Sequence, residues 1–312
     1  MSLARSALLR ASKSEWLAQQ VTHRSFTRRA VRRFMPGERL EDALDAAQAL
    51  APHRLGAVFT QLGEELSSLE EAEAVRDHYL GVFDQVRARG IDGHVSIKPT
   101  QLGLNLSMDA CAAHLDTLAA KGAETGVFFW LDMEDSTYVD RTLELYRSLR
   151  TRHDGVGLAL QSYLRRTPKD LESLLPLKPR IRLVKGAYME PAALAYPAKR
   201  DVDNAYFDLG DQMLAYAARG ELYAIFGTHD LDLVQRLSHR AADRGVGDGA
   251  WEIHMLYGIR AEEQRALAAQ GLVVKTLISY GAAWYRWYMR RLAERPANIW
   301  FVMKSLLPAA RR

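Results

Sequence analysis

Gly126-Val-Phe-Phe-Trp-Leu-Asp132 and Val156-Gly-Leu-Ala-Leu-Gln161 are two short apolar runs, and residues 137–151 between them have the pattern of a helix. Apolar runs of this length are typical of strands that are buried on both faces. A strand, a helix and a second strand in this order form the unit that joins two parallel strands of one sheet. This stretch therefore predicts an α/β fold with a parallel sheet.

The same alternation extends along most of the chain. Further strand-like runs lie at residues 94–98, 180–185, 222–226, 251–256, 273–278 and 298–302. Helical stretches separate them, among others at residues 203–219, 231–244 and 261–269. Eight strands that alternate with helices predict a closed (βα)8 barrel of the TIM type. A doubly wound open sheet is the alternative, but no Gly-x-Gly-x-x-Gly motif follows the first strand and nothing divides the alternation into two halves.

The residues before the first of these runs are expected to form an N-terminal helical arm. Its helices are expected at residues 40–50, 54–66 and 70–89, and Gly90 ends the last of them. We therefore divide the chain into an arm over residues 1–90 and a barrel catalytic domain over residues 91–312, which together form one structural unit.

The bulk composition is that of a globular protein. Of the 312 residues, 48% are hydrophobic and 26% are charged, which allows a substantial core and argues against disorder. No apolar run approaches the ~20 residues of a membrane-spanning helix, and the apolar segment of a secretory signal is missing. Cys111 is the only cysteine, which excludes an internal disulfide and is consistent with the reducing cytoplasm.

Basic residues are concentrated at the start of the chain. The net charge is +4, and residues 1–35 hold a cluster of Arg and Lys against the single acid Glu15. Three interpretations fit this segment: a transit peptide, a basic helix that touches an anionic membrane surface, and a solvated helical arm packed on the domain. We favour the arm.

The segment Tyr280–Arg291 has the pattern of a helix with an aromatic stripe that ends in a cation. The stripe recurs at helical spacing through Trp284, Trp287, Tyr288 and Arg291. Arg290 lies beside Arg291, and two adjacent guanidinium groups can hold one carboxylate through bidentate hydrogen bonds. The alternative is local pairing of both with Glu294, about one helical turn later.

Polar residues gather where the expected strands end, which is where (βα)8 barrels hold their active sites. These residues are Lys98, Asp132, Gln161, Lys185, Thr228, His229 and, inside one strand, Arg182. Cations dominate the set when Arg290 and Arg291 are added, and Asp132 is the clearest acid. A positively charged mouth indicates an anionic ligand or an anionic cofactor.

Several other kinds of site lack their residues. No His-x-His on the first strand and no His-Glu-x-x-His is present, and His229, His239 and His254 are expected to serve as hydrogen-bonding groups, so no metal site is expected. A Gly-x-Ser-x-Gly nucleophile elbow and a Walker motif are also missing. The acids within residues 132–135 share one loop, which disfavours glycoside hydrolysis.

One set of motifs is shared with a known family. It comprises Lys98, Leu131-Asp-Met-Glu-Asp135, Gln161-Ser-Tyr163, Arg182-Leu-Val-Lys-Gly-Ala-Tyr188, Thr228-His229 and Tyr288-Met-Arg-Arg-Leu-Ala-Glu-Arg-Pro296. In this order the motifs resemble proline dehydrogenase, the FAD-dependent (βα)8 enzyme of proline catabolism. The resemblance runs from about Glu64 to the end of the chain, and the length fits the short, monofunctional bacterial form.

The resemblance implies a role for each matching residue. The catalytic pair near the reacting centre would be Asp132 and Arg182. The substrate would be bound by Lys98, Leu183, Tyr188, Arg290 and Arg291. The FAD would be held by Met133, Gln161, Lys185, Gly186, Ala187, Thr228 and His229. Glu64 would act as a gate that pairs with Arg291 when the site is empty, and the C-terminal helix that carries the Arg pair would lie over the barrel mouth.

The resemblance also implies a reaction and its partners. L-Proline would lose a hydride from C5 to N5 of FAD and become 1-pyrroline-5-carboxylate, in the first step of proline catabolism. The electrons would pass to a membrane quinone, and the product would go to a pyrroline-5-carboxylate dehydrogenase. The implied location is the cytoplasm, with transient peripheral contact at the inner membrane, and no nucleic acid partner is expected.

Three departures from the family pattern leave other functions open. Leu277 stands where the family usually has Tyr, Trp287 where many members have Tyr, and His254 where Gln is common. Hydroxyproline is therefore an alternative substrate. A Schiff-base aldolase or lyase that uses Lys185 is a second alternative, because a nearby cation such as Arg182 activates a lysine. A non-enzymatic binder of anions or membranes, acting through the basic N-terminus, is a third.

Overall fold

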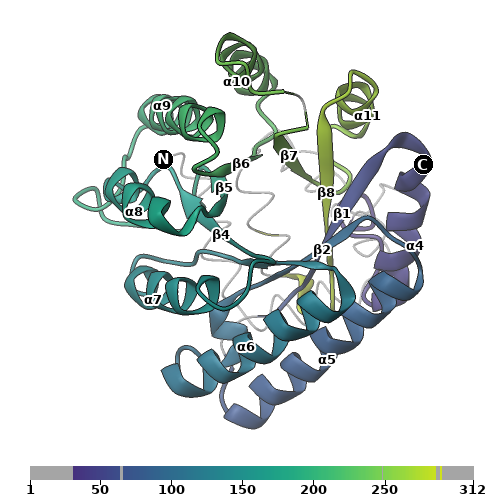
Figure 1. Ribbon diagram of the computed structural model, residues 1–312. Helices are drawn as coiled ribbons and strands as arrows, with labels where there is room; N and C mark the ends of the chain where they lie inside the picture. The colour runs from purple at the N-terminus through teal and green to yellow at the C-terminus, as the bar shows by residue number, and fades with distance from the viewer. Residues whose placement is uncertain (1–30, 64–65, 248, 286–288, 290–312) are drawn as a thin grey trace, which may run out of the picture.

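The chain folds into a closed (βα)8 barrel. The computed structural model describes residues 31–63, 66–247, 249–285 and 289. Within these ranges, strands β1 to β8 pair in sequence order, each parallel to its neighbours, and β8 closes the ring against β1. Helices surround the strands on the outside (Figure 1). The predicted TIM-type barrel is confirmed.

Most elements lie where the sequence predicts them. The strands are β1 (Leu55–Gln61), β2 (Gly93–Ile97), β3 (Phe128–Leu131), β4 (Val156–Gln161), β5 (Arg180–Val184), β6 (Tyr223–Gly227), β7 (Trp251–Leu256) and β8 (Val273–Tyr280). The helices are α4 (Leu40–Leu50), α5 (Leu69–Ala88), α6 (Met108–Thr125), α7 (Val139–Arg150), α8 (Thr167–Leu174), α9 (Lys199–Ala218), α10 (Leu231–Asp243) and α11 (Ala261–Ala269). Short 3-10 turns lie at Ala51–His53, Pro99–Leu102 and Leu175–Leu177.

The expected helix over residues 54–66 is wrong, because Leu55–Gln61 forms β1. This strand pairs along its whole length with β8 and is buried except at its last residue. A strand buried on both faces is a continuous apolar run without a period of two, so periodicity does not distinguish it from a helix. The barrel therefore begins before the boundary expected at residue 90. The run at 298–302, expected as the last strand, lies outside the described residues.

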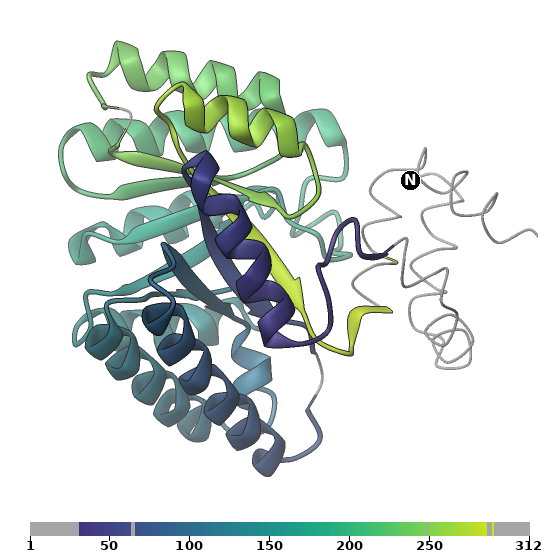
Figure 2. The same ribbon diagram turned by 90° about the vertical axis from the view of Figure 1, so that its right-hand side faces the viewer.

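The part of the expected N-terminal arm that the structure describes includes α4. This helix lies across β1 and β8 on the outside of the barrel and buries Ala43, Leu44 and Ala47 (Figure 2). Residues 1–30 lie outside the described ranges. Among the helices that are described, none has the length and apolar character needed to cross a bilayer.

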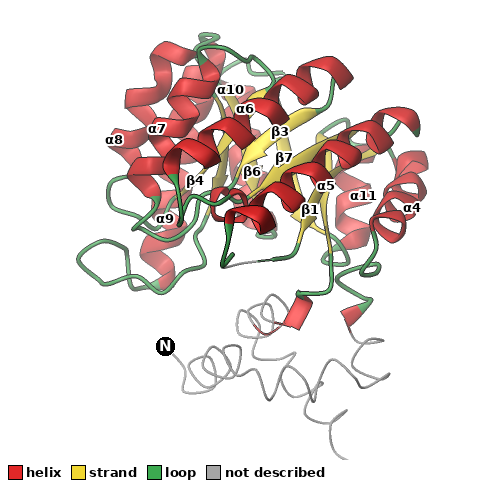
Figure 3. Ribbon diagram, turned by 90° about the horizontal axis from the view of Figure 1, so that it is seen from below, coloured by secondary structure: helices red, strands yellow, loops and turns green. Residues whose placement is uncertain are grey.

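Local signals set the ends of the helices that return the chain between strands (Figure 3). Ser68 Oγ accepts a hydrogen bond from Glu71 N at the start of α5, and Ser107 Oγ accepts one from Ala110 N at the start of α6. These caps satisfy backbone N–H groups that a helix leaves unpaired. Helix α6 ends at Gly126, whose φ of 72° lies in the left-handed region that favours glycine.

The interior of the barrel is partly polar. Strand side chains alternate between the interior and the face covered by helices. The interior contains an apolar cluster of Val58, Trp130 and Ile225, with Leu277 packed against it. The strands also bury ionisable side chains at Arg182, Glu252, His254 and Lys275. Because (βα)8 barrels are usually filled by branched apolar residues, this interior departs from the common pattern.

Gly157 in β4 leaves the space that the Trp130 ring occupies. A Cβ on Gly157 would lie 2.5 Å from Trp130 Cζ3 and 2.9 Å from Phe128 Cε1. Gly157→Ala is therefore expected to lower the free energy of unfolding by about 1–3 kcal/mol, because the ring must move. Urea unfolding measures this. Gly155→Ala is the matched control, since nothing lies within 4 Å of its Cβ. Equal losses in both variants would contradict the explanation.

Candidate active site at the barrel mouth

The parallel strands bring polar residues from distant parts of the chain to one end of the barrel. The residues that end or follow β2, β3, β4, β5 and β6 are Lys98, Asp132, Gln161, Lys185 and Thr228. The carboxyl ends of all parallel strands meet at the same rim, which we call the mouth. Of the predicted site residues, Glu64, Arg290 and Arg291 lie outside the described residues.

A buried ion pair between Arg182 and Asp132 lies at the centre of the mouth. Arg182 Nη2 donates to Asp132 Oδ1 and, at 2.8 Å, to Ser96 Oγ, and Ser96 Oγ donates to Asp132 Oδ1 at 2.9 Å. The guanidinium carbon lies 4.9 Å from the centre of the Trp130 ring. Arg182 is 2% exposed. This burial lowers the pKa of its guanidinium group, and the negative charge of Asp132 opposes the shift.

One edge of the Arg182 guanidinium is left for a ligand. Arg182 Nη1 is buried and has no hydrogen-bond partner among the described residues. A buried charged donor without an acceptor is costly, so an acceptor on a bound molecule would satisfy it. The arrangement can therefore hold a ligand that presents a hydrogen-bond acceptor or a negative charge at the barrel mouth.

The loop over residues 132–136 joins the other loops of the mouth. The Glu134 carboxylate accepts hydrogen bonds from Thr100 N at 3.0 Å and from Thr100 Oγ1 at 2.6 Å, and the Glu134 carbonyl accepts one from Gln161 Nε2 at 2.6 Å. Ser136 N and Oγ donate to the Glu190 carboxylate at 2.7 and 2.6 Å. Burial raises the pKa of Glu134, and the bonds from Thr100 oppose this shift. One loop thus fixes those that follow β2, β4 and β5.

Lys98 is a cation on a fixed turn, and none of the described residues forms an ion pair with it. Its backbone N–H donates to Gln101 Oε1 at 3.2 Å, and Gln101 Nε2 donates to the carbonyl oxygens of Gln61 at 2.9 Å and Gly63 at 3.1 Å. The turn is therefore anchored to the end of β1, and its ammonium group is available to an anion.

Lys185, the cation in the loop after β5, is paired with two carboxylates. Lys185 Nζ donates to Asp203 Oδ1 at 2.6 Å and to Asp230 Oδ2 at 3.1 Å. A lysine that two carboxylates pair is a poor Schiff-base nucleophile, so this geometry disfavours the aldolase alternative. Gly186 has a φ of +102°, and a Cβ there would lie 2.2 Å from Tyr163 Cδ1. Only glycine lets the backbone of this loop lie against the Tyr163 ring.

The remaining predicted site residues differ in their placement. Met133 and Thr228 are buried at the mouth, and Ala187 and Tyr188 lie in the loop after β5. Leu256 N donates to His229 Nε2 at 3.4 Å. Leu183 follows the inward-facing Arg182 in β5 and belongs to the large core cluster, so strand alternation turns its side chain away from the barrel interior. The structure does not support the expected packing of Leu183 against a substrate.

Three residues of this site were not predicted. Ser96 lies in β2, two residues before Lys98, which directly follows that strand, and this spacing is a signal that could have found it. Glu134 was seen only as one of several acids in a loop, since its burial depends on Thr100 from another loop. Glu190 meets Ser136 across 54 residues of sequence, and no local pattern indicates such a contact.

A hydrogen-bonded cluster lies in the barrel interior. Trp130 Nε1 donates to His94 Nδ1 at 3.1 Å, and His254 Nε2 lies 3.0 Å from Glu252 Oε2. Tyr223 OH donates to Glu252 Oε1 at 3.2 Å. The sequence did not predict that His94 meets His254, because their strands, β2 and β7, are not neighbours.

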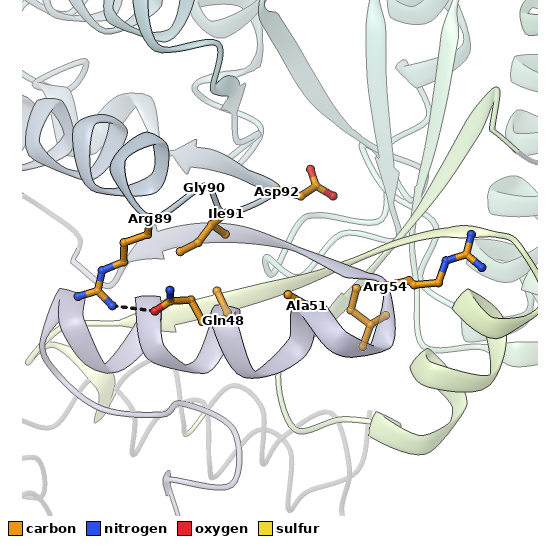
Figure 4. A pocket seen from close by; sticks show the side chains of 9 residues that line it. Gln48, Ala51, Arg54, Arg89, Gly90, Ile91 and Asp92 are labelled. Atoms are coloured by element: carbon orange, nitrogen blue, oxygen red, sulfur yellow. Dashed lines mark hydrogen bonds between the residues drawn. The ribbon is translucent and has the colours of Figure 1, made fainter.

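A cavity also lies at the opposite end of the barrel, where the strands begin. It has a volume of about 510 Å³ and is lined by Ala47, Gln48, Ala51, Arg54, Leu55, Arg89, Gly90, Ile91 and Asp92 (Figure 4). Arg89 Nη1 donates to Gln48 Oε1 at 3.1 Å, and Asp92 pairs with Lys275 at 2.6 Å. Conserved features at this end of such barrels serve stability, so the mouth is the better candidate for chemistry.

Comparisons with known proteins show which family this chain resembles. Residues 43–304 match the family described as proline dehydrogenase. Proline dehydrogenase 1 of Bacillus subtilis subsp. natto is 34% identical over 281 residues, which cover 90% of this chain and 92% of that protein. Proline dehydrogenase of Deinococcus radiodurans is 39% identical over 280 residues, which cover 88% of this chain and 89% of that protein.

Solved structures agree on the fold. Proline utilization A (PutA) from Bdellovibrio bacteriovorus superposes with a TM-score of 0.79 at 20% identity, over 93% of this chain and 36% of that chain. The PutA of Bradyrhizobium japonicum superposes with a TM-score of 0.73 at 21% identity, over 91% of this chain and 33% of that chain. This chain thus spans about a third of the solved chains that it matches.

The interior cluster predicts that acid destabilises the fold. Burial lowers the pKa of His94 well below its usual value and that of His254 to about 4, so both are neutral in the folded protein. The unfolded chain binds protons on both histidines as the pH falls through about 6.5. The stability that these neutral histidines contribute is therefore fully present above about pH 6.5 and is lost as the pH falls toward 4.

Urea unfolding at several pH values measures this loss. His254→Gln should flatten the dependence of the free energy of unfolding on pH, because one of the titrating groups is gone. His239→Gln, at an exposed position, is the control and should keep the wild-type slope. A His254→Gln protein with the wild-type slope would show that this histidine is not a source of the acid sensitivity.

Proposed function

The chain belongs to the proline dehydrogenase family, and we propose that it oxidises L-proline to 1-pyrroline-5-carboxylate at the barrel mouth. The observation that carries the proposal is the Arg182 guanidinium. Its Nη2 is committed to Asp132 and Ser96, while its buried Nη1 has no partner in the described part of the chain. A fixed positive charge with one free edge suits a reaction in which negative charge develops on a bound molecule.

FAD is the cofactor that the family implies, and the residues present fit it. Buried polar atoms around the ends of β4 and β5 have no partners among the described residues: Gln161 Oε1, Ser162 Oγ and Arg182 Nη1. The polar edge of a flavin ring offers both donors and acceptors to such groups. Because Asp203 and Asp230 already pair Lys185, we assign that lysine to holding the loop rather than to neutralising phosphate by itself.

The chain's own residues would orient the substrate. FAD, when bound, accepts the hydride that leaves C5 of proline. Lys98 would bind the proline carboxylate, together with Arg290 and Arg291 outside the described residues. Fixing the ring in this way reduces the entropic part of the barrier. Asp132 would keep Arg182 in place, and the proton that the ring nitrogen loses as C–N becomes C=N would pass to solvent.

We propose a membrane quinone as the electron acceptor and a pyrroline-5-carboxylate dehydrogenase as the consumer of the product. Met189 and Leu194, 68% and 47% exposed, are large apolar residues in the loop that follows β5. Apolar side chains beside the mouth would suit transient contact with a membrane surface. The protein would then work in the cytoplasm, at the periphery of the inner membrane.

The choice between proline and hydroxyproline concerns the three positions that depart from the family pattern. Two of the positions that depart from the family pattern, Leu277 and His254, lie in the barrel interior, where both are near Trp130. Trp287 lies outside the described residues. Among the described residues, no observation favours hydroxyproline, and L-proline remains the proposed substrate.

The visible spectrum tests cofactor and substrate together. The purified protein is expected to show the bands of oxidised flavin, and these should bleach when L-proline is added without oxygen, because hydride transfer reduces the flavin. D-Proline, the mirror image, is the control. A bound flavin that L-proline leaves unchanged would contradict the substrate and promote hydroxyproline. A colourless protein that takes up no FAD would overturn the proposal, and borohydride trapping on Lys185 would then test the Schiff-base alternative.

Lys98→Met tests the carboxylate anchor. Loss of a charged hydrogen bond should raise KM for proline about 10- to 100-fold, while the FAD content stays the same. Arg290→Met and Arg291→Ala should act in the same direction. Lys169→Met, which removes an exposed lysine from α8, is the matched control. An unchanged KM in the Lys98 variant would remove this residue from the substrate site.

A further inference from the structure

Two small residues on β4 let side chains from β3 and β5 meet inside the barrel. Trp130 of β3 is in register with Gly157, and Arg182 of β5 is in register with Ala159. Since β4 lies between these strands, larger inward side chains at both positions would separate Trp130 from Arg182. Their absence allows the contact of 4.9 Å between the guanidinium carbon and the centre of the indole ring.

The Trp130 ring is itself held on two sides. Its Nε1–H donates to His94 Nδ1 at 3.1 Å, and the His254 ring packs against it edge-on, at 5.7 Å between ring centres and an interplanar angle of 83°. The His254 ring is held in turn by Glu252, whose Oε2 lies 3.0 Å from His254 Nε2. The orientation of the indole is therefore fixed by His94 of β2, the strand next to β3, and by His254 of β7, which is not a neighbour of β3.

We propose that Trp130, held by His94, is a positioning residue that supports the Arg182 guanidinium from the barrel interior and keeps its free Nη1 edge directed to the bound ligand. This inference rests on the proposed function, because it takes Arg182 as part of the flavin and substrate centre. Arg182 has its other partners, Asp132 and Ser96, on Nη2. Without the indole face, the guanidinium could turn about these bonds.

A metal site made from the same side chains is the competing explanation. Ligand atoms of His94, Glu252 and His254 all lie within 4.8 Å of one another. The hydrogen bonds argue against it. Trp Nε1 only donates, so His94 Nδ1 accepts, and the neutral ring carries its proton on Nε2. A metal ion would have to displace the indole from Nδ1 or the proton from Nε2. The positive charge of nearby Lys275, which lowers the pKa of both histidines, also opposes a cation here.

The test compares Trp130→Leu with Phe128→Leu. Both remove an aromatic side chain from the same face of β3, and Phe128 also packs on the rings of Trp130 and His94, at 5.0 and 5.2 Å between ring centres. The cation over the Phe128 ring is Arg180, at 4.8 Å, and not Arg182, so the pair separates loss of ring packing from loss of the contact with Arg182. Anaerobic stopped-flow measurement of flavin reduction gives the maximal rate and the proline concentration at half of that rate. We expect Trp130→Leu to lower the maximal rate about tenfold, with little change in the half-saturating concentration, and Phe128→Leu to stay near the wild type.

A second pair of variants leaves the indole in place. His94→Leu removes the acceptor for Trp130 Nε1–H, whereas His94→Gln offers a carbonyl oxygen instead. The rate should fall in the Leu variant and recover in the Gln variant, at equal FAD content. A purely structural role would change stability in both without this recovery.

Each contrary outcome has a distinct meaning. Equal losses in Trp130→Leu and Phe128→Leu, or unchanged rates in both Trp130→Leu and His94→Leu, would overturn the positioning role. Zinc that co-purifies with the wild type, and whose removal by EDTA lowers the rate until zinc is restored, would replace it with the metal site. A wild type whose flavin L-proline does not reduce would overturn the proposed function, and this inference with it.

Discussion

A positive charge without access to water is the constraint on which the mouth of this barrel depends. Arg182 is almost fully buried, and removing a guanidinium group from water is costly unless partners replace the lost hydration. Those partners come from two neighbouring strands: Ser96 from β2, Trp130 from β3, and Asp132 from the position directly after β3. Only a closed sheet with this register brings them to one guanidinium. The fold therefore fixes one charge in one orientation, and no described residue binds its Nη1 edge.

The loop over residues 132–136 connects Arg182 to the other loops of the mouth through side-chain contacts. Asp132 binds Arg182, Glu134 binds the turn that follows Lys98, and Ser136 binds Glu190 in the loop after β5. One segment of backbone is thus linked to β5, to the turn after β2 and to the loop after β5. Such cross-links matter because a reaction that depends on position is sensitive to misplacements of about 1 Å.

The sequence predicts the alternation of strands and helices, and with it the barrel, because strands buried on both faces and amphipathic helices leave different patterns. Runs such as Val156–Gln161 match the observed strand to the residue. Strand β1 was missed because its apolar run has no period, and its partner β8 lies more than 200 residues away. Lys98 and Asp132 could be found because they stand at the ends of strands that the pattern predicts. Glu134 and His94 could not, because they gain their roles only through contacts between segments that are distant in the sequence. Local patterns do not encode such contacts.

The neutrality of the two interior histidines is a condition for the availability of Arg182. The barrel interior already contains Arg182 and Lys275, and the carboxylate of Glu252 is shared with Tyr223 and His254. A proton on His94 would give that ring a second N–H, at the nitrogen that accepts from Trp130, and so would break the contact that holds the indole. It would also add a positive charge close to the guanidinium. Burial, which keeps both histidines unprotonated, therefore preserves the hydrogen-bond direction and the charge balance at once. If Trp130 positions Arg182 as we propose, the polar interior supports the candidate active site from below, and the barrel core would contribute to chemistry as well as to stability.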